Sequence, residues 1–316
     1  MWLLAGLVLI LAGANWLTDG SAALARRFGL SELIIGLTVV AMGTSTPELV
    51  ISVMSAMEGS SALALGNVVG SNIFNVLVIV GVVALMRPIG ITRSVMQTQL
   101  PLTVATAALM LVMLWLGGDT LTRPCGWALV ALFGLYMAYT VVDARRNAAP
   151  DDPAAGRDTS ARDMPLWRSL LWIALGLAGL IYGGDRFVAG ASGLAQALGV
   201  GEAVVGITVV AMGTSLPELA TSVVAAHKNR PGLVVGNIIG SCIFNILLVL
   251  GAAASIFPLE LGGVTWVDLW VMTGSTVIFW WTARWGGGSR VITRAEGALM
   301  LALYCGYTAW LVARAV

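Results

Sequence analysis

The chain has 316 residues, of which 58% are hydrophobic and only 10% are charged, with a formal net charge of +1. A soluble domain carries about 25% charged residues, so this composition excludes an ordinary water-soluble protein and indicates an integral membrane protein. The net charge decides nothing about nucleic acid, but the lack of any basic groove argues against such a partner. The three cysteines form neither a CxxC motif nor an even-numbered disulfide framework.

Ten apolar stretches of the roughly 20 residues needed to cross a bilayer follow one another along the chain. The first starts next to Met1, where neither a basic segment nor a small-residue cleavage site indicates a signal peptide. We expect ten transmembrane helices, at residues 2–25, 31–57, 62–86, 94–117, 122–142, 166–189, 202–227, 231–257, 263–284 and 292–313.

The only long polar segment runs from Asp143 to Pro165, and it separates two halves with five expected spans each. We therefore expect a first five-helix repeat at residues 1–143, a cytoplasmic linker at 144–165 and a second repeat at 166–316. The linker is too short to hold a folded regulatory domain.

Charge placement predicts the orientation of the spans. If both termini lie on the outer face, fourteen of the seventeen Lys and Arg residues lie in cytoplasmic loops or at their edges. The exceptions are Arg123, Arg186 and Arg314. Short cytoplasmic loops of membrane proteins are enriched in these two residue types. Because five spans per half is an odd number, the second half must enter the membrane upside down, and we expect inverted repeats.

The two halves repeat two segments at a constant offset of 170 residues. Residues 36–56 read GLTVVAMGTSTPELVISVMSA and residues 206–226 read GITVVAMGTSLPELATSVVAA. The segment GNVVGSNIFN at 66–75 returns as GNIIGSCIFN at 236–245. Interrupted helices at matching positions of two halves are typical of membrane transporters and indicate an ion site near the membrane midplane.

The repeated segments contain groups that suit a cation. Pro47 has no backbone N–H, so the carbonyl of Gly43 loses its helical partner, and the second repeat has the same arrangement. A carboxylate at the bilayer centre costs at least about 2.5–3.5 kcal/mol on insertion scales, so structure alone hardly explains both Glu48 and Glu218. Carboxylate, hydroxyl, carboxamide and carbonyl oxygens, without a His or Cys cluster, favour hard cations.

Other repeated features have purely structural readings. A single proline often only kinks a membrane helix, and the two Gly-x-x-x-Gly segments match a common helix-packing pattern. Asn75 and Asn245 could join helices by hydrogen bonds. Glu32 and Glu202, also 170 residues apart, are explained by a favourable interaction with helix N-termini.

The pair of Gly-Thr-Ser-x-Pro-Glu and Gly-Asn-x-x-Gly-Ser-x-x-x-Asn segments resembles the two α-repeats of the sodium/calcium exchanger family, within the cation/calcium antiporter superfamily. The resemblance extends over the ten spans, the inverted halves and the central linker. It implies an all-α integral membrane fold of ten transmembrane helices, with helices 2, 3, 7 and 8 broken and the ions bound between them at the midplane.

The resemblance also implies a set of ion ligands. Glu48 and Glu218 would be the principal carboxylates, Ser71 and Ser241 would add sodium ligands, and two backbone carbonyls would serve the outer sodium sites. Besides the glutamates and these two serines, the implied ligands are Thr44, Ser45, Thr214, Ser215, Asn75, Asn245, Ala41 and Ala211.

The chain departs from the family pattern in two ways. Many sodium/calcium exchangers have Asp at one of the positions of Asn75 and Asn245, but this chain has Asn at both. One negative charge from each glutamate then gives the site a formal charge of only about −2, and potassium co-transport is disfavoured. Cys242 replaces the Asn found at position 72, and because a thiol is a poor ligand for hard cations we expect it to pack.

We therefore expect a secondary antiporter, not an enzyme, that exports Ca²⁺ using inward Na⁺ by alternating access. No GxxxxGK[ST] sequence is present, so ATP is not the direct energy source. We expect the cell (inner) membrane as its location and no cofactor, nucleic acid or obligate protein partner. Two alternatives stay open: an H⁺/Ca²⁺ antiporter, since paired carboxylates can bind protons, and a cation channel, against which the inverted repeat argues.

Overall fold

Helices make up nearly all the secondary structure in this computed structural model, which describes residues 2–146, 164–197, 211–285 and 290–315. Lipid offers no hydrogen-bond partners to the backbone, and a helix satisfies its backbone N–H and C=O groups internally. In the described part of the chain, seven helices are long and apolar enough to span a membrane, and the bent pair Glu32–Thr44 and Thr46–Met57 makes eight. The all-α membrane fold is confirmed, whereas the expected count of ten spans is not.

The two expected spans missing from this count have different explanations. The span at 202–227 lies partly outside the described residues, as does most of the linker at 144–165. The span at 263–284 is present as the continuous 20-residue helix α15 (Trp266–Trp285). α15 carries Asp268 and Arg284 and is not among the helices counted as apolar enough to span a membrane.

The described chain divides into two compact units, and each unit combines segments from both halves. Unit 1 takes Met1–Thr44, Val141–Ile238 and Cys305–Val316, and unit 2 takes Ser45–Thr140 and Ile239–Tyr304. Three helices contribute residues to both units: α8 (Arg123–Arg146), α13 (Pro231–Phe244) and α16 (Arg294–Ala315). The repeat boundaries at 143 and 166 stay a prediction.

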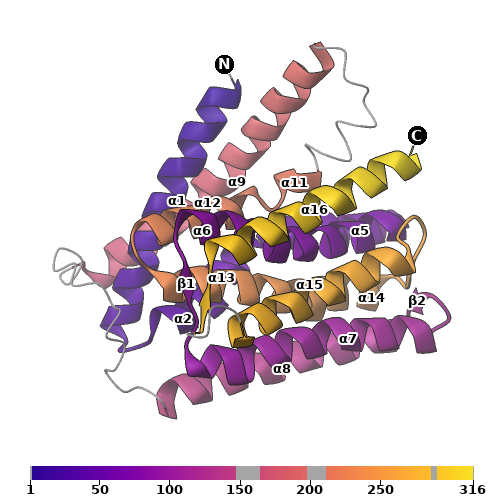
Figure 1. Ribbon diagram of the computed structural model, residues 1–316, viewed down its shortest axis with the longest axis horizontal. Helices are drawn as coiled ribbons and strands as arrows, with labels where there is room; N and C mark the ends of the chain where they lie inside the picture. Colours follow the sequence, from indigo (N-terminus) through magenta and orange to yellow (C-terminus); the bar gives the residue numbers. More distant parts are fainter. Residues whose placement is uncertain (1, 147–163, 198–210, 286–289, 316) are drawn as a thin grey trace. The chain divides into compact units, whose positions relative to one another are not determined.

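Unit 1 is built on two long helices, α1 (Trp2–Arg27) and α9 (Leu166–Ala197), which lie side by side (Figure 1). A Cβ added to Gly6 would meet residues 183 and 187, whereas one added to Gly20 would meet residues 169 and 173, so the helices are antiparallel. They are equivalent in the two halves, and their opposite directions agree with inverted repeats. Unit 1 also holds α2 (Glu32–Ile35), η1 (Gly36–Val40), α3 (Ala41–Thr44), α11 (Ala211–Gly213) and α12 (Leu216–His227).

Ion pairs connect α1 and the start of α2 to the turn between α12 and α13 within unit 1. Lys228 Nζ lies 2.7 Å from Asp19 Oδ1, and Arg230 Nη1 lies 2.7 Å from Glu32 Oε1. Ser31 Oγ accepts a hydrogen bond from the Ile34 N–H at 3.3 Å, which makes Ser31 the N-cap of α2. Glu32 therefore lies at a helix N-terminus, as the sequence predicts, and has an ion-pair partner as well.

Unit 2 contains two short antiparallel strand pairs that join the two halves. β1 (Ile89–Gly90) pairs with β4 (Val291–Ile292), and β2 (Thr120–Leu121) pairs with β3 (Leu259–Glu260). β3 lies 170 residues after β1. Each pair therefore joins one strand of the first half to one strand of the second half, and the two pairs are equivalent under the repeat. The other elements are α15 and α4 (Thr46–Met57), α5 (Ser61–Ile73), η2 (Phe74–Ile79), α6 (Val80–Met86), η3 (Val95–Gln99), α7 (Leu100–Leu116), η6 (Asn245–Leu250) and α14 (Gly251–Ile256).

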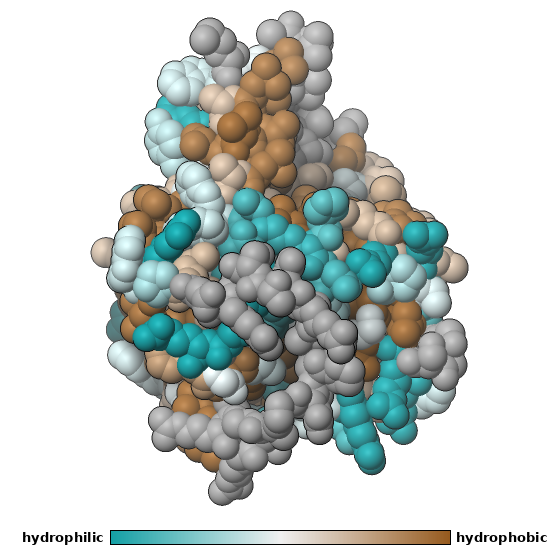
Figure 2. All heavy atoms as spheres, turned by 90° about the vertical axis from the view of Figure 1, so that its left-hand side faces the viewer, coloured by the Kyte–Doolittle hydropathy of each residue, from teal (hydrophilic) through white to brown (hydrophobic). Residues whose placement is uncertain are grey.

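The surface carries many large apolar side chains, as a lipid-facing protein requires. Trp115 is 71% exposed, Leu116 73% and Leu135 66%. Figure 2 shows brown hydrophobic side chains beside groups of teal hydrophilic ones on one face of the molecule. The large number of such exposed apolar side chains agrees with a surface that faces lipid.

Candidate cation site

The first repeated motif forms a helix break in both halves. α3 ends at Thr44 and α4 begins at Thr46, with Pro47 in its first turn. In the second half α11 ends at Gly213 and α12 begins at Leu216. The serines at the breaks have nearly identical backbones, with φ −86° and ψ 10° at position 45 and φ −89° and ψ 4° at position 215.

Glu48 and Glu218 occupy the first turn of the helix after each break, and both side chains are completely buried. The N–H groups and the positive dipole end of a helix favour a carboxylate in this position. Within unit 2, the Ser71 hydroxyl also donates to Glu48 Oε1 at 3.3 Å. Burying a charged carboxylate is costly unless it is paired, and a bound cation would supply such a pairing.

An asparagine fixes the backbone of each glutamate. Asn67 Nδ2 donates to the Glu48 carbonyl at 3.2 Å and to Ser52 Oγ at 2.9 Å. In unit 1, Asn237 Nδ2 donates to the Glu218 carbonyl at 3.2 Å and to Ser222 Oγ at 3.0 Å. These four residues were not among the expected ligands, although Asn67 with Asn237, and Ser52 with Ser222, recur at the offset of 170.

The expected hydroxyl and carbonyl ligands lie in or beside the breaks. In unit 1, the buried Thr44 hydroxyl lies 3.2 Å from Asn237 Oδ1 and 3.4 Å from the Ala41 carbonyl, and it donates to these oxygens. Ser45 and Ser215 are fully buried, whereas Thr214 is half-buried. Ala41 and Ala211 are the first residues of α3 and α11.

The expected carboxamide ligands lie on π-helical turns of unit 2. Asn75 is the second residue of η2, and Asn245 is the first residue of η6. Both side chains are fully buried, and π-helical turns inside α-helices are frequent at functional sites. In the described part of the chain, neither Asn75 polar atom has a hydrogen-bond partner, and the same holds for Asn245 Oδ1 and the buried Ser241 Oγ. Cys242 is fully buried, as expected of a packing residue.

The twelve expected ligands fall equally into the two units. Those of unit 1 are Ala41, Thr44, Ala211, Thr214, Ser215 and Glu218, and those of unit 2 are Ser45, Glu48, Ser71, Asn75, Ser241 and Asn245. Direct contacts join Thr44 to Ala41 in the first set and Ser71 to Glu48 in the second. Within the described residues no three His, Cys, Asp or Glu side chains form a metal cluster, so the candidate ligands are mainly neutral oxygens around single carboxylates.

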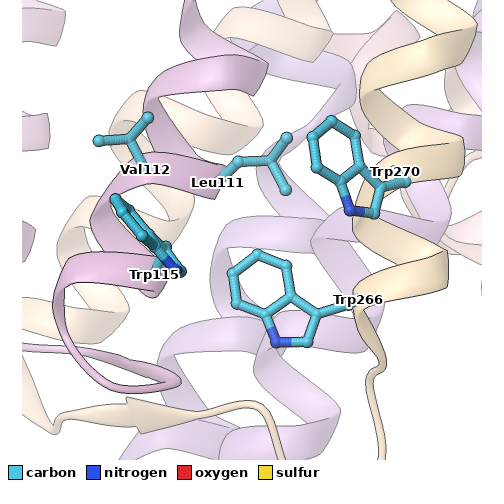
Figure 3. Close-up of a pocket in the computed structure, with 5 residues that line it drawn as sticks. All are labelled: Leu111, Val112, Trp115, Trp266 and Trp270. Carbon is cyan, nitrogen blue, oxygen red and sulfur yellow. The ribbon is translucent and has the colours of Figure 1, made fainter.

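An apolar pocket elsewhere in unit 2 has no part in this chemistry. It has a volume of about 370 Å³ and is lined by Leu111, Val112 and Trp115 of α7 and by Trp266 and Trp270 of α15 (Figure 3). The indole N–H of Trp266 donates to Asp119 Oδ1 at 3.0 Å. The lining offers no oxygen ligand, so the pocket is not a candidate cation site.

The chain matches the family model described as sodium/calcium exchanger protein over residues 1–142 and 168–313. It is 36% identical to the putative antiporter CaxA of Alkalimonas amylolytica, with 97% of this chain and 96% of the relative covered. It is 29% identical to the sodium/calcium exchanger MaX1 of Methanosarcina acetivorans, with 82% and 83% covered.

Solved structures of the sodium-calcium exchanger NCX_Mj have the same fold. One of them, soaked with 10 mM Na⁺ and no Ca²⁺, superposes with a TM-score of 0.83 at 31% sequence identity. The superposition covers 98% of this chain and 97% of that structure. The similarity therefore spans both halves of the chain and both helix breaks.

Proposed function

Because the chain belongs to the sodium/calcium exchanger family, we propose that it exchanges Na⁺ for Ca²⁺ across the cell membrane and exports Ca²⁺. Family membership makes it a cation antiporter of the membrane and not an enzyme. The choice of ions is supported by the names of MaX1 and NCX_Mj, both sodium/calcium exchangers. No comparison favours H⁺ as the coupling ion.

The observation that carries this proposal is the pair of fully buried glutamates, each directly after an equivalent helix break. We propose that Glu48 and Glu218 are the principal carboxylate ligands of the transported ions. Hard cations prefer oxygen ligands, and Ca²⁺ takes six to eight of them. The hydroxyl, carboxamide and carbonyl ligands of the proposal are Thr44, Ser45, Thr214, Ser215, Ser71, Ser241, Asn75, Asn245, Ala41 and Ala211.

Charge compensation provides the coupling in this proposal. Two ionised glutamates give a formal charge of about −2, which one Ca²⁺ or two Na⁺ neutralise. An empty site would carry its full negative charge into the low-dielectric interior, where an uncompensated charge is costly. The site therefore changes sides only with Ca²⁺ or Na⁺ bound, which makes the transport of one ion depend on the other.

The orientation of the proposal follows the distribution of basic residues. Both termini face the outside and the linker at 144–165 faces the cytoplasm, because this arrangement puts most Lys and Arg in cytoplasmic loops. The inner membrane of the cell is the proposed location. An inward Na⁺ gradient across this membrane drives Ca²⁺ outward, because an antiporter moves its two ions in opposite directions.

Flux measurements on the purified protein in proteoliposomes test the proposal. An imposed Na⁺ gradient is expected to drive ⁴⁵Ca²⁺ across the membrane at constant pH, with a protonophore present to collapse any proton gradient. Movement of ⁴⁵Ca²⁺ only under a pH gradient would identify an H⁺/Ca²⁺ antiporter. Movement without any counter-ion gradient, at rates that do not saturate with Ca²⁺, would identify a channel.

A further inference from the structure

We propose that Asn72 is a positioning residue that fixes the Asn245 carboxamide so that its oxygen is presented to the transported cation. Nothing in the repeated pattern marks Asn72 as a ligand, because the second half has Cys242 at the equivalent position. The inference rests on the proposed function, in which Asn245 is an ion ligand. All the residues that carry it lie in unit 2.

The hydrogen bonds of Asn72 determine which end of its side chain faces which neighbour. Asn72 Nδ2 lies 3.4 Å from the backbone carbonyl of Cys242 on α13 and 3.9 Å from Met272 Sδ on α15. A backbone carbonyl can only accept a hydrogen bond, and a thioether sulfur likewise has no proton to donate. The amino group of Asn72 must therefore face these two atoms, which leaves its oxygen on the opposite side.

This orientation passes to Asn245. Asn245 Nδ2 donates to Asn72 Oδ1 at 3.1 Å, so the amino group of Asn245 is held by the oxygen of Asn72. If Asn245 flipped, its own oxygen would face that oxygen, and two acceptors without a proton between them repel each other. Asn245 Oδ1 is thus the atom left over, and in the described part of the chain it is buried without a partner. A buried unpaired carbonyl oxygen is costly, and a bound cation removes that cost.

The two repeat-equivalent asparagines are therefore not equivalent in this protein. In the repeat, position 72 corresponds to position 242 and position 245 to position 75, so the residue equivalent to Asn72 on the Asn75 side is Cys242. A thiol is only a weak hydrogen-bond donor and acceptor. Among the described residues, Asn75 has no partner for either its oxygen or its nitrogen. The Asn245 carboxamide is thus held with its oxygen available, whereas no side-chain amide of the described residues holds the Asn75 carboxamide. We infer that Asn245 contributes more to Ca²⁺ affinity than Asn75.

The test is a double-mutant cycle on ⁴⁵Ca²⁺ exchange in proteoliposomes driven by a Na⁺ gradient. The variant Asn72→Cys introduces the residue that the chain itself carries, fully buried, at the equivalent position 242. We expect it to raise the KM for Ca²⁺ about two- to tenfold, the scale of one buried hydrogen bond, with little change in the maximal rate. Asn72→Ala serves as a second variant with the same expected result, should the cysteine variant fold poorly.

The coupling between mutations separates positioning from a structural role. Asn245→Ala is expected to raise the KM for Ca²⁺ less in the Asn72→Cys background than in the wild type, because part of its contribution is already lost. Asn75→Ala is the matched control, and its effect is expected to be the same in both backgrounds. Equal coupling to both asparagines, or a loss of maximal rate without a change in KM, would overturn the inference while the proposed function stands. A wild type that moves no Ca²⁺ under a Na⁺ gradient would instead refute the proposed function and the inference with it.

Discussion

Glu48 and Glu218 occupy equivalent positions in their two helices. Each is fully buried, each lies in the first turn after a break, and each has its backbone carbonyl bonded to an asparagine at 3.2 Å. A kink alone requires none of these features, because proline bends a membrane helix without a neighbouring acid. The repetition of the whole arrangement is what supports a shared role in binding cations.

Removal of either carboxylate charge is therefore expected to disable exchange. Glu48→Gln and Glu218→Gln keep the size of the side chain, but each removes half the formal charge available to Ca²⁺. We expect each variant to lower the apparent Ca²⁺ affinity at least about tenfold, which corresponds to a loss of only about 1.4 kcal/mol. ⁴⁵Ca²⁺ uptake at several Ca²⁺ concentrations measures the effect, and the exposed Glu58→Gln is the control. Wild-type uptake in both buried variants would remove these residues from the site.

At the residue scale, the sequence predicts the acids better than their surroundings. Apolar flanks and a constant offset make Glu48 and Glu218 conspicuous, since an acid within a membrane span needs an explanation. The sequence also repeats Asn67 as Asn237 at the same offset, so a shared role of these two residues could have been predicted. A repeated asparagine is compatible with several structural roles, however, and does not by itself indicate a bond to the glutamate backbone. The contact of Asn72 with Asn245 was not accessible, because position 72 breaks the repeat and the contact joins residues 173 apart.

At the scale of the elements, the antiparallel pair α1 and α9 depends on the absence of side chains at its interface. Gly6, Gly13 and Gly20 recur at intervals of seven residues along one side of α1. A Cβ on Gly13 would lie 2.7 Å from the Gly176 carbonyl oxygen and 2.8 Å from the Leu180 nitrogen, both of them backbone atoms of α9. Small residues let membrane helices approach this closely, and van der Waals contacts then stabilise the pair.

We expect Gly13→Ala to destabilise the protein, because neither backbone atom of α9 can move away independently of its helix. Overpacking of this kind typically costs about 1–3 kcal/mol. The matched control is Gly134→Ala on α8, where no atom lies within 4 Å of the added Cβ and alanine is the better helix former. Thermal unfolding in detergent is expected to give a lower Tm for Gly13→Ala only. Equal Tm values for the two variants would mean that α1 and α9 are not in close contact.

Other elements show where sequence patterns fail. The expected spans at 2–25, 62–86 and 94–117 agree to within two residues at each end with the observed continuous helical stretches Trp2–Arg27, Ser61–Met86 and Val95–Leu116, because polar residues and prolines flank these apolar segments. The π-helical turns η2 and η6 were not predicted, since their sequences are uniformly apolar after the asparagine and carry no periodic signal. The two-residue strand pairs are also too short for an alternating pattern.

At the scale of the whole molecule, the inverted repeat was predictable from an odd number of spans and the distribution of Lys and Arg. Two observations agree with it independently: α1 and α9 are antiparallel within unit 1, and β1–β4 and β2–β3 are equivalent connections within unit 2. The grouping into units was not predictable, because it depends on contacts between segments far apart in the chain. Each unit takes residues from both halves, so neither expected repeat is a unit by itself.

The number of buried acidic side chains bears on whether exchange requires K⁺ as a further transported ion. In the described part of this chain, the only completely buried acids are Glu48 and Glu218. Asp268 is 6% exposed, but it accepts hydrogen bonds from the Thr265 N–H at 2.7 Å and the Thr265 hydroxyl at 2.8 Å. Asp268 therefore stabilises the start of α15.

We accordingly expect exchange that does not require K⁺. One Ca²⁺ already neutralises two glutamates, and a K⁺ bound beside it would leave an excess positive charge in a low-dielectric interior, where an unpaired charge is strongly disfavoured. Replacement of K⁺ by choline on both sides of the proteoliposome membrane is expected to leave the initial rate of Na⁺-driven ⁴⁵Ca²⁺ exchange unchanged. Replacement of Na⁺ by choline is the positive control and is expected to stop exchange. A rate that falls to background without K⁺ would require a further anionic ligand, and would contradict the assignment of the site charge to Glu48 and Glu218 alone.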